Sequence, residues 1–202
     1  MATLIFIGTI IALLIVAFKI ILNLSQHKPI WSSVRMLIII LLSYFLLWVF
    51  FYLLSSDRPV PFGTDICFDD WCATITEVEV PGTSGVDSLQ LNLVGQLFIV
   101  HIKMTNKARG IAQKPSEPRV KIIDRDGNSY VSSIEGQQAL EESRGRQIPF
   151  DARLELHQSL ETQLVFEIPQ GKNDLKAVIE EGPLITRLLF YSDREIFLLN
   201  SP

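Results

Sequence analysis

The sequence predicts an all-β domain, an antiparallel β-sandwich, carried on an N-terminal transmembrane α-helical hairpin. Two long apolar runs fill the first 54 residues, which contain no Asp or Glu and only three Lys or Arg. The remaining chain has 15 Lys and Arg against 22 Asp and Glu, a net charge of −7. It also alternates between apolar and polar residues in short segments separated by turn residues. This break in composition indicates a lipid-embedded part followed by an acidic part in water.

The two apolar runs are expected to be transmembrane helices. Residues 2–24 would form a helix about 34 Å long and residues 34–54 one about 31 Å long, and both lengths cross a hydrocarbon core. A short polar connector, residues 25–33, joins them. The first run has no positive charge before its apolar core and no convincing cleavage site after it. We therefore expect a retained span rather than a cleaved signal peptide.

Charged and aromatic residues predict how the hairpin is oriented in a cytoplasmic (inner) membrane. Lys19, Lys28 and Arg35 lie around the connector, and the positive-inside rule places the connector in the cytoplasm. Lys19 is close enough to the helix end to reach the interface, and Trp48 and Tyr52 suit an aromatic belt. These five residues are the candidate interface anchors. Both the N-terminus and the chain after the hairpin would then lie outside the cytoplasm.

A linker, residues 55–64, is expected to precede the domain, residues 65–200. Within the domain, residues 96–106 and 160–168 alternate strictly between apolar and polar side chains. Alternation with a period of two predicts strands that bury one face, because successive side chains of a strand point to opposite sides.

Several shorter strands complete the expected sandwich. About seven short strands separated by turns are typical of this architecture. One segment, residues 134–146, has helical character and is expected to be a short excursion or a long loop. The shorter strands are expected at residues 73–80, 119–123, 175–180, 184–190 and 195–199.

The segment CFDDWC contains both cysteines of the chain, Cys67 and Cys72. Outside the cytoplasm, an even number of cysteines favours a disulfide. Cys67 and Cys72 could staple a tight turn, and the entropic model gives so short a loop roughly 2 kcal/mol. Phe68 and Trp71 would then pack into or against the core.

Other interpretations of this segment remain open. A thioredoxin-like redox centre favours Cys-x-x-Cys at the start of a helix, a shorter spacing than the one here. A blue-copper site needs a histidine close behind the cysteine. A zinc site would have to recruit His101 or His157 from elsewhere. Asp69 and Asp70 suit an exposed corner of the turn, and as an acid–base pair they lack any partner that the sequence names.

The segment DRDGNSYVSSIE places oxygen-bearing side chains at the ligand positions of an EF-hand calcium loop. Ser129 stands at the sixth position, where that loop needs glycine, and the preceding residues read as a strand rather than an entering helix. We favour the alternative, a strand, an Asp-Gly hairpin turn and a return strand. The candidate calcium ligands are Asp124, Asp126, Asn128, Tyr130, Ser132 and Glu135.

Three short motifs carry a resemblance to a known family. They are Thr105-Asn106 at the end of a strand, Asp124, Gly127 and Tyr130 as Asp-x-x-Gly-x-x-Tyr, and Phe166 to Pro169 as Phe-x-Ile-Pro. From about residue 60 to residue 199 the chain resembles the bacterial extracytoplasmic immunoglobulin-like domain of unknown function, found on lipoproteins and secreted immunoprotective antigens. The resemblance implies an immunoglobulin-like sandwich, and its motifs are structural rather than catalytic. The usual lipoprotein anchor is replaced here by the two-helix hairpin.

We therefore expect a membrane-anchored, extracytoplasmic immunoglobulin-like binding or interaction module of unknown ligand, not an enzyme, with no cofactor. Its expected partners are the lipid bilayer and a protein of the envelope or membrane, and its acidic, external domain argues against nucleic acid. The alternative is an accessory subunit of a membrane complex that docks through the hairpin, where Gly8 and Ala12 form a small-xxx-small pair. A calcium-responsive domain is a weaker alternative.

Overall fold

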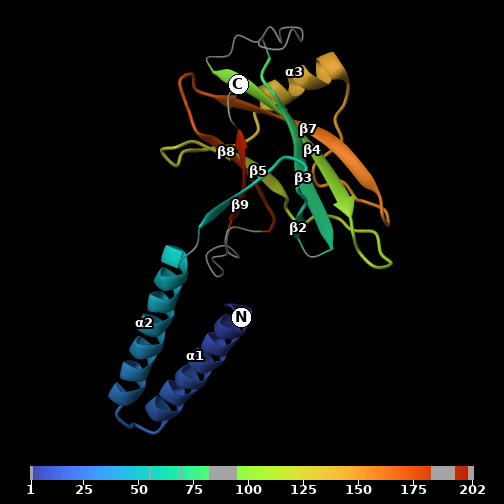
Figure 1. Ribbon diagram of the computed structural model, residues 1–202. Coiled ribbons are helices and arrows are strands. Elements are labelled where there is room, and N and C mark those ends of the chain that lie inside the picture. The colour runs from blue at the N-terminus through green and yellow to red at the C-terminus, as the bar shows by residue number, and fades with distance from the viewer. Residues whose placement is uncertain (1, 55, 69, 82–94, 183–193, 200–202) are drawn as a thin grey trace. The chain divides into compact units, whose positions relative to one another are not determined.

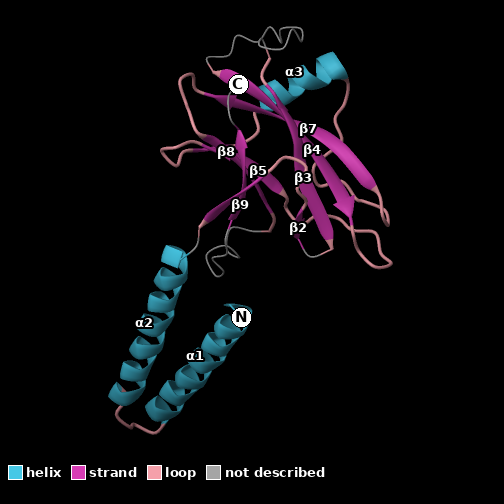
Figure 2. Cartoon of the chain, viewed as in Figure 1, coloured by secondary structure: helices cyan, strands magenta, loops and turns pink. Residues whose placement is uncertain are grey.

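The computed structural model describes residues 2–54, 56–68, 70–81, 95–182 and 194–199. These residues form two compact units, an N-terminal helical hairpin and a β-sandwich that begins at Asp57. Figure 1 labels the elements along the chain, and Figure 2 separates helices from strands by colour. The expected strand at residues 184–190 lies outside the described residues.

The hairpin consists of α1 (Ala2–Ser25) and α2 (Trp31–Leu54), each 24 residues and therefore about 36 Å long. By length and composition, Phe6–Ser25 and Trp31–Phe51 could each cross a membrane. The second helix begins three residues earlier than expected. Pro29 lies just before it, where the missing N–H of proline costs no helical hydrogen bond.

One face of each helix packs against the other helix. Val16 of α1 and Ser33 of α2 are buried in this contact, and Asn23 donates a hydrogen bond from Nδ2 to Ser33 Oγ (3.3 Å). The Phe6 and Tyr44 rings lie 6.5 Å apart. Many large apolar side chains on the other faces are exposed, and apolar surface of this extent calls for lipid or protein to cover it.

The second unit is a sandwich of two sheets. One sheet has four strands in the order β2-β3-β4-β7, and the other has five in the order β1-β9-β8-β5-β6. The four-stranded sheet contains β2 (Ile66–Phe68), β3 (Trp71–Glu79), β4 (Gln96–Asn106) and β7 (Ser159–Ile168). The five-stranded sheet contains β1 (Asp57–Val60), β9 (Arg194–Leu199), β8 (Leu175–Glu180), β5 (Arg119–Ile123) and β6 (Ser129–Tyr130).

The inner faces of the two sheets share one apolar core. Phe166 from the four-stranded sheet and Phe197 from the five-stranded sheet are both fully buried in it. Each such side chain contributes about 1.5–3 kcal/mol to folding by leaving water. The alternation in β4 and β7 predicts their inward faces correctly, because Phe98, Val100, Ile102, Met104 and Ile168 are also in this core.

The first strand of the sandwich departs from expectation. β1 lies in residues 55–64, where the sequence predicts a linker, and it pairs with β9 in parallel, from Asp57 opposite Arg194 to Val60 opposite Phe197. Three of its four residues are exposed, so β1 shows no apolar alternation from which a strand could be predicted. The sandwich is therefore mixed at this edge rather than purely antiparallel.

The segment expected to be an excursion or a long loop contains a helix, α3 (Ile134–Arg144). Its N-cap residue is Ser133, whose Oγ accepts a hydrogen bond from Gly136 N (3.1 Å). Leu140 of α3 packs with Ile99 and Val165, which point away from the main core, and all three are fully buried. The helix therefore covers the outer face of the four-stranded sheet beside β7 (Figure 2).

The same helix protects the edge of β7, which is the last strand of its sheet. Ser133 N donates to Val165 O (2.7 Å), and Gln137 Nε2 donates to Gln163 O (3.0 Å). Val165 N in turn donates to Gln137 Oε1 (3.2 Å). The Gln137 amide thus takes the place of a neighbouring strand at Gln163 and Val165, and covering backbone groups in this way is one means of protecting a sheet edge.

Candidate functional site

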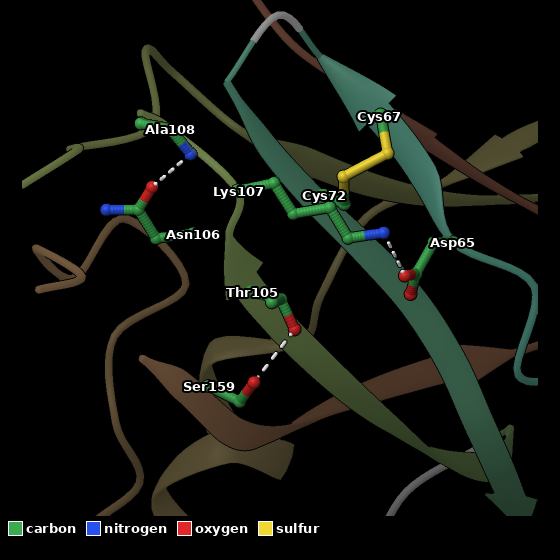
Figure 3. Close-up of a disulfide and its surroundings, with 8 residues drawn as sticks. All are labelled: Asp65, Cys67, Cys72, Thr105, Asn106, Lys107, Ala108 and Ser159. Atoms are coloured by element: carbon green, nitrogen blue, oxygen red, sulfur yellow. Dashed lines mark hydrogen bonds and ion pairs between the residues drawn. A yellow bond between two sulfur atoms is a disulfide. The ribbon is translucent and has the colours of Figure 1, made fainter. Parts of the chain in front are cut away.

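The β2–β3 hairpin is closed by a disulfide between Cys67 and Cys72, as the sequence predicts (Figure 3). The two cysteines are direct partners across the hairpin, with Cα atoms 4.0 Å apart. Cys72 is buried whereas Cys67 is exposed. The bond therefore fixes the end of the four-stranded sheet at the surface.

Phe68 and Trp71 pack at this end of the core, also as predicted. Their rings are stacked with centroids 5.1 Å apart, and Phe150 meets Trp71 edge-on at 6.1 Å. Trp71 Nε1 donates a hydrogen bond to Glu181 Oε1 (2.8 Å), which also accepts from Ser116 N (2.9 Å). The indole is therefore satisfied as a structural group.

Asp69 lies outside the described residues, so the alternative of an acid–base pair between Asp69 and Asp70 is not tested. Asp70 accepts two hydrogen bonds. Lys107 N donates to Asp70 O (2.8 Å) and Gln113 Nε2 donates to Asp70 Oδ2 (3.1 Å). Lys107 also extends its ammonium to Asp65 Oδ2 at 2.6 Å (Figure 3). These contacts bind the stapled turn to the loop that follows β4.

Asn106, the second residue of the Thr-Asn motif, organises that loop. Its side chain is buried, and its Oδ1 accepts from Ala108 N (2.8 Å), as Figure 3 shows. Its Nδ2 donates to Ile111 O (3.1 Å) and Leu154 O (3.0 Å). One amide thereby joins two loops to the end of β4. The neighbouring Thr105 makes only an exposed hydroxyl contact with Ser159 (3.0 Å).

The proposed calcium segment forms the predicted β5–β6 hairpin, with Ile123 opposite Ser129. Asp124 lies buried at its base and accepts hydrogen bonds from Asn128 N (2.9 Å), Asn128 Nδ2 (2.8 Å) and Tyr130 OH (2.9 Å). Lys172 Nζ lies 2.8 Å from Asp124 Oδ2. Burial would raise the pKa of Asp124, but these hydrogen bonds outweigh it and hold the pKa well below its usual range.

Lys172 occupies the position that a cation would need in this hairpin. Its Nζ bridges Asp124 Oδ2 and Asp126 Oδ2 (2.9 Å), and both contacts raise the pKa of Lys172 above its usual range. Ser132 forms a bridge to Phe166 of β7, and Glu135 is exposed in the first turn of α3. The hairpin therefore accounts for the Asp-x-x-Gly-x-x-Tyr motif without calcium, and calcium binding stays a prediction.

A second polar cluster, which the sequence does not reveal, lies on the outer face of the four-stranded sheet. It is a ring of four side chains, Glu79 of β3, His101 of β4, Gln163 of β7 and Arg144 of α3. Arg144 Nη2 lies 2.7 Å from Glu79 Oε2, and its Nη1 lies 3.4 Å from Gln163 Oε1. Gln163 Nε2 lies 3.3 Å from His101 Nδ1, and His101 Nε2 lies 2.6 Å from Glu79 Oε1.

A β-bulge in β3 assembles this ring. Before the bulge, Ala73 and Ile75 point into the core; after it, Val78 points inward, so Glu77 and Glu79 turn outward. Without the shift between Ile75 and Glu77, both acids would point into the apolar core. In the sequence, the inward apolar residues change from odd-numbered positions (Ala73, Ile75) to an even-numbered one (Val78). This change is the signal that could have revealed the bulge.

The hydrogen bond from Arg144 is the main cause that holds the pKa of Glu79 below its usual range. Glu79 in return raises the pKa of Arg144. Glu77, Glu79 and His101 offer one ligand atom each within 4.8 Å of one another, a set that suits zinc. A metal ion would have to compete with the Arg144 guanidinium for Glu79, so the arrangement fits an ion-pair network better than a metal centre.

A polar hollow of about 90 Å³ adjoins the ring. It is too small for an ordinary organic ligand, since such sites usually have volumes of roughly 300 Å³ or more. Its lining residues are Thr76, His101, Ile102, Gln147, Glu161, Thr162 and Gln163.

A larger hollow is apolar and lies at the β1–β9 edge of the other sheet. This groove has a volume of about 340 Å³, and nothing in the sequence pattern reveals it. Phe62, in the turn after β1, stacks on the buried Phe197 with ring centroids 6.1 Å apart. The groove is lined by Pro59, Val60, Pro61, Phe62 and Leu198.

The five predicted interface anchors all belong to the hairpin unit. Lys19, Lys28 and Arg35 are exposed, and Trp48 is half-buried and stacks with Phe45 at 6.4 Å in α2. Tyr52 also lies in α2. Contact with lipid is still a prediction for each of them.

No family model and no curated protein matches this sequence. Several solved structures are similar to the chain. The secreted protein MPT63 from Mycobacterium tuberculosis has 11% identity and a TM-score of 0.46, covering 71% of this chain and 98% of its own. An uncharacterized β-sandwich protein from Clostridium difficile has 14% identity and a TM-score of 0.45, covering 72% and 96%. The yjhA protein from Bacillus subtilis has 13% identity and a TM-score of 0.45, covering 68% and 97%. At this level of similarity these proteins transfer no function to the chain.

Proposed function

We propose that this protein is a membrane-anchored binding module whose β-sandwich, of immunoglobulin-like type, is held outside the cytoplasm by a two-helix anchor. In this proposal the domain recognises a partner in the envelope and catalyses no reaction. The two-helix anchor would hold the domain at the membrane, and the sandwich would present a rigid, water-exposed surface to the partner.

The disulfide is the main observation that supports the proposed location outside the cytoplasm. Cys67 and Cys72 are bonded at the surface of the sandwich, and such bonds persist in oxidising compartments but are rare in the cytoplasm. The positive charges Lys19, Lys28 and Arg35 cluster around the connector at the other end of the hairpin, which independently favours a cytoplasmic connector.

The polar clusters support a role without catalysis. Glu79 is paired with Arg144, and Asp124 is paired with Lys172 and bonded to Tyr130. A general base must be free to accept a proton from substrate, and these carboxylates instead hold α3 and the β5–β6 hairpin in place. They stabilise the scaffold on which a binding surface is built.

Maleimide gel-shift labelling of intact cells tests the location. With the domain outside, Cys67 and Cys72 should label only after reduction, and membrane-impermeant reductant and maleimide should suffice. Two controls in a Cys67→Ser/Cys72→Ala background calibrate the result. Asn173→Cys, an exposed residue of the sandwich, should label in intact cells, whereas Gln26→Cys in the connector should label only after the membrane is opened. The reverse pattern would place the domain in the cytoplasm and end the proposal.

An accessory subunit of a membrane complex is the second candidate, and one observation favours it. Gly8 is exposed on α1, and a Cβ at this position would meet nothing within 4 Å. The small residue is therefore not required by the packing of α1 against α2, and it leaves room for a helix of another chain. Crosslinking in membranes, compared between wild type and Gly8→Leu, separates the candidates. Loss of a stoichiometric membrane partner in Gly8→Leu supports the subunit, while partner capture that is unchanged supports the binding module.

A further inference from the structure

The apolar groove at the β1–β9 edge leaves two large apolar side chains facing water. Phe62 and Leu198 in this groove are 44% and 43% exposed, although both are large apolar side chains. We propose that the groove is a lipid-docking surface, which seats the sandwich on the outer face of the bilayer through Phe62 and Leu198. This proposal rests on the membrane anchoring proposed above.

The groove is a fixed part of the fold. The Phe62 ring lies against Phe197, which is fully buried in the core. Backbone hydrogen bonds hold the turn on both sides of this ring, because Gly63 N donates to Ile75 O (2.9 Å) and Thr64 N donates to Pro61 O (3.2 Å). Gly63 has a φ of 84°, which a side chain would disfavour. An exposed aromatic ring held in place in this way is suited to insertion at an interface.

The chemistry of the groove favours hydrocarbon over a peptide strand. β1 is the edge strand of its sheet, and an added strand would need N–H donors from it. Pro59 within β1 and Pro61 directly after it have no N–H. All five lining residues are apolar, so the groove offers shape and hydrophobicity without directional polar side chains.

The length of chain between the anchor and the groove keeps them close. α2 ends at Leu54, and β1 begins three residues later at Asp57, which limits their Cα separation to about 11 Å. Phe62 follows Leu54 by eight residues, so even a fully extended chain allows about 28 Å. The chain therefore limits the distance between Phe62 and the end of the anchor to about 28 Å, whatever the orientation of the domain.

Cations border the groove on the β8–β9 side. Lys176 is the strand partner of Leu198, and its Nζ lies 3.2 Å from Asp57 Oδ2. Arg194 Nε lies 3.5 Å from the other oxygen of the same carboxylate. The Lys176 stem can lie along apolar surface while its ammonium reaches the phosphate of an anionic headgroup.

Spin-label accessibility in the full-length protein tests the proposal. Nitroxide labels are placed at Phe62→Cys and Leu198→Cys in nanodiscs of phosphatidylcholine and phosphatidylglycerol, in a Cys67→Ser/Cys72→Ala background. The same labels are repeated with the native disulfide present, in case the background is less stable. Collisions with oxygen, which concentrates in lipid, are compared with collisions with a water-soluble nickel chelate. Ile111→Cys is the matched control, because Ile111 is an apolar residue, 60% exposed, in the loop after β4.

We expect oxygen to collide more often than nickel at positions 62 and 198, and the opposite ratio at position 111. Leu46→Cys, at an exposed position of α2, reports on the anchor itself. If position 46 contacts lipid while 62 and 198 contact water, the groove does not dock and the anchor still stands. If position 46 also contacts water, the membrane anchoring is wrong. If 62 and 198 are shielded from both reagents, protein covers the groove, and the lipid proposal is overturned.

Discussion

Arg144 at the C-terminal end of α3 holds Glu79 of β3, with Nη2 2.7 Å from Oε2, and so joins segments 65 residues apart. Replacement by Arg144→Met should remove the charge-assisted hydrogen bond while keeping most of the side chain. We expect the pKa of Glu79 to rise toward its usual value and the free energy of unfolding to fall by about 1 kcal/mol, since both groups are partly exposed. Carboxyl NMR titration and urea unfolding measure the two effects.

The pH dependence of this contact has a defined sign. The folded-state pKa of Glu79 lies below its usual value of 4.5, so its stabilising contribution is complete above that pH and is lost as the pH falls below it. The difference in stability between wild type and Arg144→Met should therefore shrink in acid. Arg153→Met, which loses only an exposed 3.8 Å contact with Glu155, is the control and should be neutral. An equal loss in both variants would contradict the prediction.

Gly136→Ala should destabilise the sandwich although alanine favours helices. A Cβ at Gly136 would lie 2.6 Å from Val165 Cγ1, beneath α3. Overpacking costs about 1–3 kcal/mol, whereas the higher helix propensity of alanine compared with glycine stabilises the protein by only about 1 kcal/mol. The net loss should appear as a lower urea midpoint. Gln138→Ala, at an exposed position of the same helix, should be neutral or slightly stabilising, and a gain in stability for Gly136→Ala would show that α3 can move away from β7.

Asn106→Ala should be among the more damaging polar substitutions in the domain. It would leave the buried N–H of Ala108 without a partner and remove a hydrogen bond from each of the Ile111 and Leu154 carbonyls, of which Leu154 O still accepts from Gln113 N. We expect a loss of roughly 3 kcal/mol, because an unsatisfied buried N–H adds its lost hydration to the lost hydrogen bonds. Thr105→Ala, which removes only an exposed hydroxyl contact, should stay within about 0.5 kcal/mol of wild type. Similar losses in the two variants would argue against the role given to Asn106.

Cys67→Ser/Cys72→Ala should lower the free energy of unfolding by about 2 kcal/mol, the value the chain-entropy model gives for so short a loop. Trp71 fluorescence in a Trp31→Phe/Trp48→Phe background follows unfolding of the sandwich without signal from the hairpin. Reduced wild-type protein is the matched control and should show the same loss. A much larger loss in the variant than in the reduced protein would mean that the substitutions harm packing around the buried Cys72 rather than removing a staple.

Asp124→Asn tests the β5–β6 hairpin. The folded-state pKa of Asp124 lies below its usual value of 3.8, so its contribution is present at neutral pH and is lost as the pH falls through the acid range. The variant should be less stable than wild type at neutral pH, and the two should converge in acid. Asp174→Asn, an exposed acid whose nearest cation contact is 4.0 Å long, is the control. A difference that persists unchanged in acid would contradict the role of the Asp124 charge.

The sequence predicts those parts of the fold that repeat a simple period. β5 and β8 begin and end where the alternation indicates, and the Cys67–Cys72 disulfide agrees with the prediction made from the cysteine spacing and the expected oxidising compartment. β1 could not be predicted from the sequence, because its four residues are mostly exposed and include a proline. The ring of Glu79, His101, Gln163 and Arg144 could not be predicted for another reason. It depends on a one-residue bulge and on strand register, and both are set by tertiary packing.

The pairing of β1 with β9 has a consequence for the order of events during biogenesis. β1 follows the anchor directly, yet its sheet neighbour is the final described strand, from Arg194 onward. Contacts between segments so distant in sequence form late, because a long chain must first be brought together. The groove that contains Phe62 and Leu198 therefore forms only once β9 has paired with β1. In the proposed topology, docking of the domain on the membrane would follow the export of β9.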